Sequence, residues 1–245
     1  MTAVDVGRRH QPAPRSRTLD VVRLQFINTQ TFVWVPILVL SGSWVISMLI
    51  YWILRTAGVE GVVVGGGAQA PLWYFLVIGA QALALSFPFS QAMSLTRREF
   101  FVGSIAAAAV SALGMAVVFV LLGLLELATD GYGWDSYFAH LPWVWEEGAL
   151  VAGLGYFVAT MLVFILGFWF ATIYKRFGTA ALTLVILAVS LVLLGFVALV
   201  TWQRAWPEVW EWILTTGVLG LTLWGVLLAV VLAAGSYLTL RRMPA

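Results

Sequence analysis

Six long apolar runs constrain this chain more than any other feature of its sequence. A helix needs about 20 apolar residues to cross the hydrocarbon core of a bilayer, and each run is long enough. Hydrophobic residues make up 62% of the chain and charged residues only 10%, whereas a soluble domain carries about a quarter charged residues. We therefore predict an all-α fold, a bundle of six transmembrane helices at 32–54, 71–93, 101–127, 149–173, 179–202 and 211–238.

The basic residues indicate how these helices are oriented. If the N-terminus is cytoplasmic, the outer loops contain only Arg55 and Arg204. This bias follows the positive-inside rule, so we predict a multi-pass membrane protein with both termini in the cytoplasm. The remaining basic residues then fall in cytoplasmic segments: Arg8, Arg9, Arg15, Arg17, Arg23, Arg97, Arg98, Lys175, Arg176, Arg241 and Arg242.

The chain divides into three predicted regions. Residues 1–16 contain two prolines and no large apolar cluster, which is typical of a disordered tail. Residues 17–31 place Leu19, Val22 and Phe26 on one helical face, a pattern typical of an amphipathic helix in the inner membrane interface. A frayed cytosolic tail is the alternative for this segment. Residues 32–240 form the transmembrane domain.

What the sequence lacks excludes or disfavours several kinds of site. The absence of cysteine excludes disulfides and thiolate metal sites, and no ligand pattern accompanies His10 or His140, so we predict no metal. The glycine run in loop 55–70 lacks the Lys and Ser/Thr of a phosphate-binding loop, and we expect only a flexible connector there. The basic residues are scattered over four segments without interleaved aromatics, so we expect no nucleic-acid partner.

The cores of the six runs contain no Asp, Glu, Lys, Arg or His, and Glu126 comes only at the outer end of the third. Proton relays and most ion-coupled transporters need ionisable groups at membrane depth, so these mechanisms are disfavoured. We expect no catalytic residue and no cofactor in this chain. Pro36 and Pro88 should each free a carbonyl that needs a partner on a neighbouring helix.

Rows of small residues predict close helix packing. They recur every four positions on three of the runs, as Ser104, Ala108, Ala112 and Ala116, as Ala149 and Gly153, and as Gly225, Ala229 and Ala233.

The outer loop 128–148 is the largest segment outside the runs, and it is rich in aromatic residues. We expect it to form a short helix or helix pair at the outer interface. Asp135, Trp143 and Glu146 are its candidate residues for a cation, a substrate or a gate. A solvated rim is the simpler interpretation of the same carboxylates.

The hinge, which we define as residues 94–101 (SLTRREFF), places charge between the second and third runs. We predict a helix of one or two turns here, before a third span that begins near Phe100. Thr96 and Glu99 have the T-x-x-E spacing of a capping box. Arg97 and Arg98 would then project into the cytoplasm.

Together these features resemble the membrane subunit of an ABC-2-type ABC transporter, the permease class of many bacterial exporters. The resemblance rests on the amphipathic segment before the first span, six spans with both ends inside, the hinge, and the small-residue-rich third span. In that family the larger outer element often lies between the fifth and sixth spans, whereas here the largest outer loop follows the third.

The resemblance implies a location in the bacterial inner (plasma) membrane and docking of the hinge on an ATP-binding subunit. The implied coupling residues are Thr96, Arg97, Arg98 and Glu99, with a possible second contact at Lys175 and Arg176. It also implies a second permease chain, identical or related, and contact with membrane lipids, while ATP and Mg²⁺ would be held by the partner ATPase.

The expected function is therefore a permease subunit that moves a hydrophobic or amphipathic compound outward without catalytic residues of its own. Two alternatives remain: a membrane scaffold or sensory subunit that forms no path, and a membrane-embedded lipid-modifying enzyme. Arg97 and Arg98 could also be topology anchors and nothing more.

Overall fold

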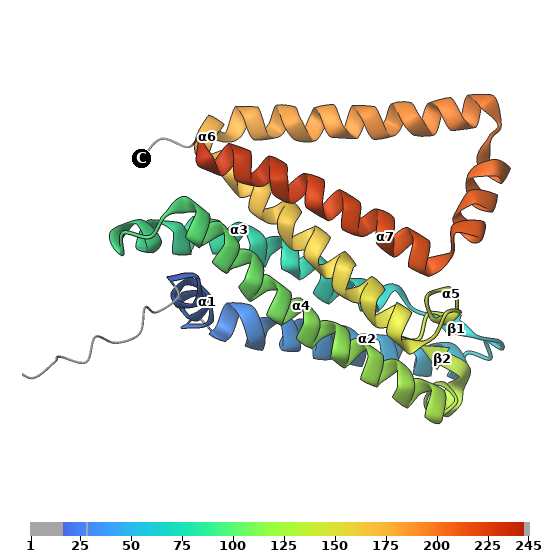
Figure 1. The fold of residues 1–245 in the computed structure, drawn as a ribbon. Coiled ribbons are helices and arrows are strands. Elements are labelled where there is room, and N and C mark those ends of the chain that lie inside the picture. Colours follow the sequence, from blue (N-terminus) through green and yellow to red (C-terminus); the bar gives the residue numbers. More distant parts are fainter. Residues whose placement is uncertain (1–16, 28, 243–245) are drawn as a thin grey trace, which may run out of the picture.

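The computed structural model describes residues 17–27 and 29–242, so the predicted tail at 1–16 lies outside the described residues. Within them the chain is almost entirely helical (Figure 1). The elements in chain order are α1 (Arg17–Ile27), η1 (Gln30–Trp34), α2 (Val35–Thr56), β1 (Val63–Val64), η2 (Gly66–Ala68), α3 (Gln69–Ala92), α4 (Arg97–Ala128), η3 (Gly131–Asp135), β2 (Ser136–Tyr137), α5 (Pro142–Trp145), α6 (Ala149–Gln203) and α7 (Trp206–Arg241).

Among the described residues, five helical segments are long and apolar enough to cross a membrane, whereas the sequence predicts six. The difference lies in α6, whose 55 residues include both the fourth and the fifth predicted runs. Gly178 interrupts α6 with a non-helical backbone (φ 82°, ψ 180°), and the helix bends sharply there (Figure 1). A positive φ of this kind is accessible to glycine without a steric penalty, which explains why the break falls at Gly178.

A second break divides α7 at Gly217 (φ 66°, ψ 176°). The segment before it, residues 206–216, begins with Trp206 and Pro207 and carries two acidic residues. The segment after it, residues 218–241, runs back toward the end of the bundle where α1 lies (Figure 1). The sixth predicted run therefore contains a short helix and a long one.

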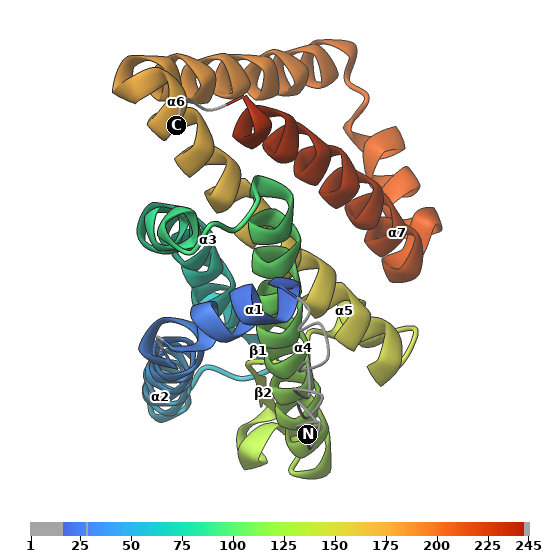
Figure 2. The same cartoon turned by 60° about the vertical axis from the view of Figure 1, so that its left-hand side comes forward.

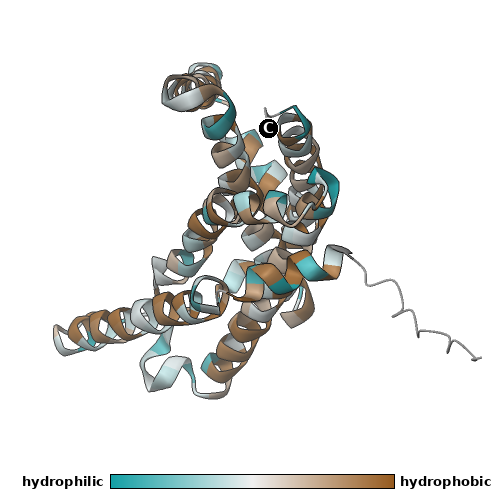
Figure 3. Cartoon of the chain, turned by 90° about the vertical axis from the view of Figure 1, so that its left-hand side faces the viewer, coloured by the Kyte–Doolittle hydropathy of each residue, from teal (hydrophilic) through white to brown (hydrophobic). Residues whose placement is uncertain are grey.

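The long helices expose most of their apolar side chains, and hydrophilic residues gather at helix ends and along α1 (Figure 3). The part of α6 beyond Gly178 is exposed along nearly all its length. Such a surface is stable when lipid is the solvent. The five long apolar helices thus suggest a multi-pass membrane protein.

The bundle is closest packed where α3 crosses α6. A Cβ atom added at Gly167 would collide with the backbone carbonyl of Leu76, and one added at Gly79 would collide with the carbonyl of Phe164. The two backbones therefore touch at a pair of glycines. The fully buried rings of Phe164 and Phe168 lie beside this contact on α6, with ring centroids 6.3 Å apart.

Helix α1 lies across α4 rather than apart from the bundle (Figure 2). Val21 is fully buried, and a Cβ atom at Gly103 would collide with its side chain. The buried Gln25 amide donates to Ser104 Oγ (3.0 Å) and accepts from Ser86 Oγ (2.9 Å). The contact face of α1 is thus centred on Val21 and Gln25, while the predicted apolar face leaves Leu19 exposed.

The predicted row of small residues on α4 is buried along its whole length, at Ser104, Ala108, Ala112 and Ala116. The prediction for Pro88 is also confirmed. Proline has no N–H, so the carbonyl of Ala84 one turn earlier lacks its helical donor. Lys175 Nζ on α6 donates to that carbonyl at 3.1 Å.

The α3–α6 crossing gives the first testable prediction. Gly167→Val should lower the free energy of unfolding by about 3 kcal/mol or more, because the new side chain meets backbone that cannot move aside. Thermal unfolding of the purified chain in detergent measures this loss. Gly195→Val is the matched control, since a Cβ at Gly195 on the same helix meets nothing within 4 Å. Equal unfolding temperatures for the two variants would contradict the close crossing.

Candidate functional site

The hinge is a tight connection rather than a separate helix. Helix α3 ends at Ala92 and α4 begins at Arg97, so the predicted short helix and the predicted start near Phe100 are both wrong. The capping box itself is confirmed: Glu99 N–H donates to Thr96 Oγ1 (3.2 Å), and Thr96 N–H donates to the Glu99 carboxylate (2.8 Å). It caps the long helix directly, because only four residues separate the two helices and a further helical turn has no room.

Arg97 does not project away from the protein as predicted. Its guanidinium Nη1 donates to the carbonyl of Arg241 at 2.9 Å and to that of Leu240 at 3.3 Å. These carbonyls belong to the last turn of α7, where the helix leaves acceptors unpaired and the dipole favours a cation. Arg97 therefore joins the beginning of α4 to the end of α7.

The other predicted coupling residues are placed differently from Arg97. Arg98 is exposed beside it at the start of α4. Lys175 is bonded to Ala84, as described above, and the Arg176 guanidinium lies 4.5 Å from the centre of the Phe177 ring. Arg98 and Lys175 are both exposed, but Lys175 is bonded to a neighbouring helix, and Arg176 lies against the ring of the adjacent Phe177.

At the opposite end of the bundle, the segment 129–148, which we call the cap, is organised around a buried carboxylate. Glu126 is fully buried near the end of α4 and accepts hydrogen bonds from the backbone N–H groups of three consecutive cap residues. The distances are 3.1 Å from Phe138, 3.0 Å from Ala139 and 2.7 Å from His140. Converging N–H groups replace the water that a carboxylate loses on burial.

A tyrosine completes the shell of donors around Glu126. Tyr132 donates its hydroxyl to the carboxylate at 3.2 Å and accepts from Trp44 Nε1 of α2 at 3.0 Å. Burial raises the pKa of Tyr132 to about 12, so its hydroxyl keeps the proton that it donates. The carboxylate thus links α4 to the cap and, through Tyr132, to α2.

The glycine-rich loop 57–68 has a packing role that its sequence did not indicate. Its strand β1 pairs in parallel with β2 of the cap, with Val63 opposite Ser136. Side chains added at Gly65 or Gly67 would collide with Tyr51 or Ser47 of α2. The loop is therefore more than the simple connector predicted, because its glycines allow it to lie flat on α2.

Arg55, one of the two basic residues that break the charge bias, also holds this region together. Its guanidinium donates to the carbonyls of Val59 (3.0 Å), Gly61 (2.7 Å) and Trp134. A single side chain thereby joins the end of α2 to its own loop and to the cap. Its structural role accounts for a positive charge at this end of the bundle.

A second cap carboxylate supports the break in α7. Glu147 Oε1 accepts from the backbone N–H of Val218 at 2.7 Å and of Leu219 at 3.3 Å. These are the first N–H groups after Gly217, and they have no carbonyl partner within their own helix. Glu147 therefore acts as an N-cap provided by another segment, with its negative charge at the favourable end of the helix dipole.

The outer residues proposed from the sequence do not come together as a site. Asp135 and Glu146 are exposed, and so is Trp143, at 59% of its surface. No group of three or more His, Asp or Glu side chains placed to hold a metal occurs among the described residues. At this end of the bundle, Glu126 and Glu147 instead bind backbone N–H groups.

The cap is also less helical than predicted. It contains the irregular turn η3 and the four-residue helix α5. Six of its residues have positive φ: Asp130, Gly131, Tyr132, Gly133, Asp135 and Gly148. Such a backbone cannot continue as a regular helix. Phe138 and Trp145 are nonetheless buried, as expected for an aromatic segment against the bundle.

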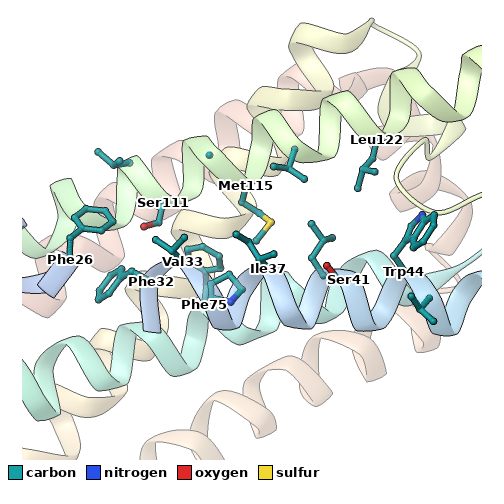
Figure 4. Close-up of a pocket in the computed structure, with 16 residues that line it drawn as sticks. Phe26, Phe32, Val33, Ile37, Ser41, Trp44, Phe75, Ser111, Met115 and Leu122 are labelled. Carbon is teal, nitrogen blue, oxygen red and sulfur yellow. The ribbon is translucent and has the colours of Figure 1, made fainter. Parts of the chain in front are cut away.

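Two large apolar grooves flank α4. One, of about 720 Å³, lies between α2 and α4 and is lined by residues such as Ile37, Trp44, Ser111 and Met115 (Figure 4). The other, of about 650 Å³, lies between α4 and the first turns of α6, near Gly153. A third, polar pocket of about 30 Å³ lies beside Gln25 and Gln81. The two large grooves formed by the described residues could thus accommodate apolar molecules, whereas the polar pocket is small.

The sequence did not reveal the roles of three residues that organise these regions: Gln25, Glu126 and Glu147. Each had a weak signal, because each is a polar side chain next to or within a strongly apolar stretch. Glu126 and Glu147 bind mainly backbone N–H groups, and Gln25 binds side chains at least 61 positions away in the sequence. Partners of either kind cannot be identified from one sequence.

The buried carboxylate gives a second prediction. Glu126→Gln replaces one acceptor oxygen with a donor that faces backbone N–H groups, so it should destabilise the cap by about 2 kcal/mol. Hydrogen–deuterium exchange should show faster exchange of the amides of residues 138–140, together with a lower unfolding temperature. Glu146→Gln, at an exposed carboxylate, is the control and should leave both unchanged. If Glu126→Gln preserves the protection of these amides, the carboxylate does not hold the cap.

His140 gives a third prediction. Burial lowers its pKa from the ordinary value of 6.5, although the charge of Glu126 opposes this shift. The unfolded chain therefore takes up a proton at a higher pH than the folded cap does, so stability is present above pH 6.5 and is lost as the pH falls below that value. The variant His140→Phe tests this prediction, because it keeps a ring between Tyr137 and Trp145 that cannot titrate. Unfolding temperatures are measured above and below pH 6.5. Acidification should lower the unfolding temperature of the wild type more than that of the variant. The same acid sensitivity in both would contradict the role of His140.

Comparison with known proteins identifies no relative: no family model, no curated protein and no solved structure matches this chain.

Proposed function

We propose that this chain is the permease subunit of an ATP-driven exporter that moves a hydrophobic or amphipathic compound, with ATP and Mg²⁺ held by a separate subunit. The observation that carries the proposal is the arrangement of the hinge. The hinge begins α4 without an intervening helix, and its Arg97 holds the last turn of α7. A partner that pushes on the hinge therefore moves two long helices together.

In this proposal the chain crosses the membrane six times, because α6 crosses twice. The parts of α6 on either side of Gly178, residues 149–177 and 179–203, are each long enough for one crossing. An even number of crossings agrees with the position of α1, the hinge and the end of α7 at one end of the bundle (Figure 1). The charge bias makes this end cytoplasmic.

The short helix at 206–216 adds support for the family resemblance. It lies between the proposed fifth and sixth crossings, at the end of the bundle where the cap lies (Figure 1). This is the place where ABC-2-type permeases often have their larger outer element. The chain then has an outer helical element there in addition to the cap.

The exposed part of α6 beyond Gly178 supports assembly with a second permease chain. A half-size permease needs a partner to enclose a pathway. The large grooves on the described part of one chain are apolar and flank α4 on its outside, so we place the pathway between two chains.

A membrane scaffold or sensory subunit is the second candidate. The apolar lining of both large grooves favours it, because transport of an amphipathic compound needs some polar surface along the route. A lipid-modifying enzyme has less support, since the carboxylates of the buried Glu126 and of Glu147 bind backbone N–H groups.

The decisive experiment is purification from the native membrane followed by reconstitution into vesicles. We expect an ATP-binding polypeptide to co-purify, and ATP hydrolysis by the complex to drive accumulation of a hydrophobic dye. Co-purification without any transport would favour the scaffold. A chain that purifies alone and transports under an ion gradient would overturn both proposals.

Arg98 gives a fourth prediction, which concerns the coupling surface. Arg98→Ala should reduce ATP-driven transport about tenfold or more, a loss of roughly 1.4 kcal/mol or greater, because the exposed guanidinium would bind carboxylates of the ATPase. The capping box and the Arg97 contacts remain in this variant, so insertion and unfolding temperature should not change. Arg23→Ala is the control, since Arg23 is another exposed basic residue near the same end. Unchanged turnover in Arg98→Ala would leave this residue as a topology anchor.

A further inference from the structure

The groove between α2 and α4 is lined almost entirely by apolar side chains. Its side chains are apolar apart from Ser41, Ser111 and the indole N–H of Trp44. That indole donates to Tyr132, and Ser111 Oγ has no partner among the described residues. At about 720 Å³ the groove falls within the size range of small-molecule sites, roughly 300–1,000 Å³. It is a large, almost entirely apolar space.

Such a space does not remain empty or fill with water. Water needs two or more polar partners at a site, and the walls of this groove offer few. An unfilled space also deprives the lining atoms of dispersion contacts on one side. Inside a bilayer, the groups available to occupy such a groove are the acyl chains of lipids.

The ends of the groove argue against a helix as its occupant. At one end, the rings of Phe26 in α1 and Phe32 in η1 approach to 5.7 Å between centroids. At the other end, Trp44 is joined to the cap through Tyr132. Figure 4 shows Phe26 and Phe32 at one end of the open stretch and Trp44 at the other. Phe32 and Trp44 are twelve residues apart, or about 18 Å of helix, whereas a membrane-crossing helix needs about 30 Å and is 10–12 Å wide.

Gly114 is the residue that keeps the α4 wall open. A Cβ atom added there meets nothing within 4 Å, and Gly114 lines the groove beside Ser111 and Met115. Glycine in the middle of a helix lowers helix stability by about 1 kcal/mol relative to alanine. The open space at Gly114 is therefore present although it destabilises α4.

We propose that one acyl chain of a membrane phospholipid occupies this groove as a retained ligand, in contact with Ile37 on one side and Met115 on the other. The bound chain joins α2 to α4 where their own side chains leave a gap. This lipid site does not depend on the transport function proposed above.

A photo-crosslinking experiment tests the site. The purified chain is supplied with a small amount of phospholipid that carries a diazirine in one acyl chain, irradiated, and mapped by mass spectrometry. We expect adducts at 37–45 and 110–118 in excess of those at 223–231, an exposed apolar stretch of α7 that serves as the reference for bulk lipid. Gly114→Phe should lower the groove adducts about tenfold, equivalent to roughly 1.4 kcal/mol. Gly195→Phe, at another glycine with open space, should leave them unchanged.

Three results would overturn the proposal. The first is equal labelling of the groove and of 223–231, which would mean that only bulk lipid contacts the groove. The second is groove labelling that persists in a folded Gly114→Phe variant, or in Gly114→Leu if the larger side chain prevents folding. The third is disulfide-linked dimers formed through Ile37→Cys and Val118→Cys in this cysteine-free chain, which would assign the groove to a second copy.

Discussion

Backbone hydrogen bonding without water is the constraint on which the structure depends. In lipid, each N–H or C=O group that a helix break or end leaves unpaired needs a partner within the protein. This chain uses its scarce charged side chains for that purpose. Lys175 binds the carbonyl that Pro88 leaves free, and Glu147 binds the N–H groups after the Gly217 break. Arg97 does the same for the end of α7.

The cap follows the same rule on a larger scale. Its backbone is too irregular to satisfy its own N–H groups, and the Glu126 carboxylate accepts three of them at once. Arg55 provides the opposite charge for three carbonyls in the neighbouring loops. These charged side chains therefore lie where regular helical hydrogen bonding is interrupted or ends, whereas the cores of the predicted spans contain no charged residue.

Much of the fold could be predicted from the sequence, because apolar length and charge bias are local signals. The long apolar helices, the capping box of Thr96 and Glu99, and the carbonyl freed by Pro88 are all found. The two predicted runs on either side of Gly178 form one helical element, because the non-helical backbone of α6 is confined to Gly178. The start of α4 was misplaced because one capping motif can begin a short helix or a long one.

The candidate site was harder to predict, because its partners are distant backbone groups. A carboxylate in the sequence does not reveal whether it faces solvent, as Glu146 does, or a set of N–H groups, as Glu126 does. Arg97 and Arg98 are neighbours with the same side chain, yet only the position of α7 separates their roles. The glycines at 79 and 167 likewise become meaningful only when α3 and α6 are known to cross.

The pairing of β1 with β2 has a consequence for synthesis of the protein. The loop after α2 emerges from the ribosome early, but Tyr51 and Gly65 bind the backbone of Tyr137, which is made more than seventy residues later. The Ala139 carbonyl accepts a hydrogen bond from the Tyr156 hydroxyl of α6, which is synthesised later still. Contacts between such distant residues form slowly, because a long loop has to close first. The end of the bundle that carries the cap is therefore completed only after the first half of α6 has been synthesised.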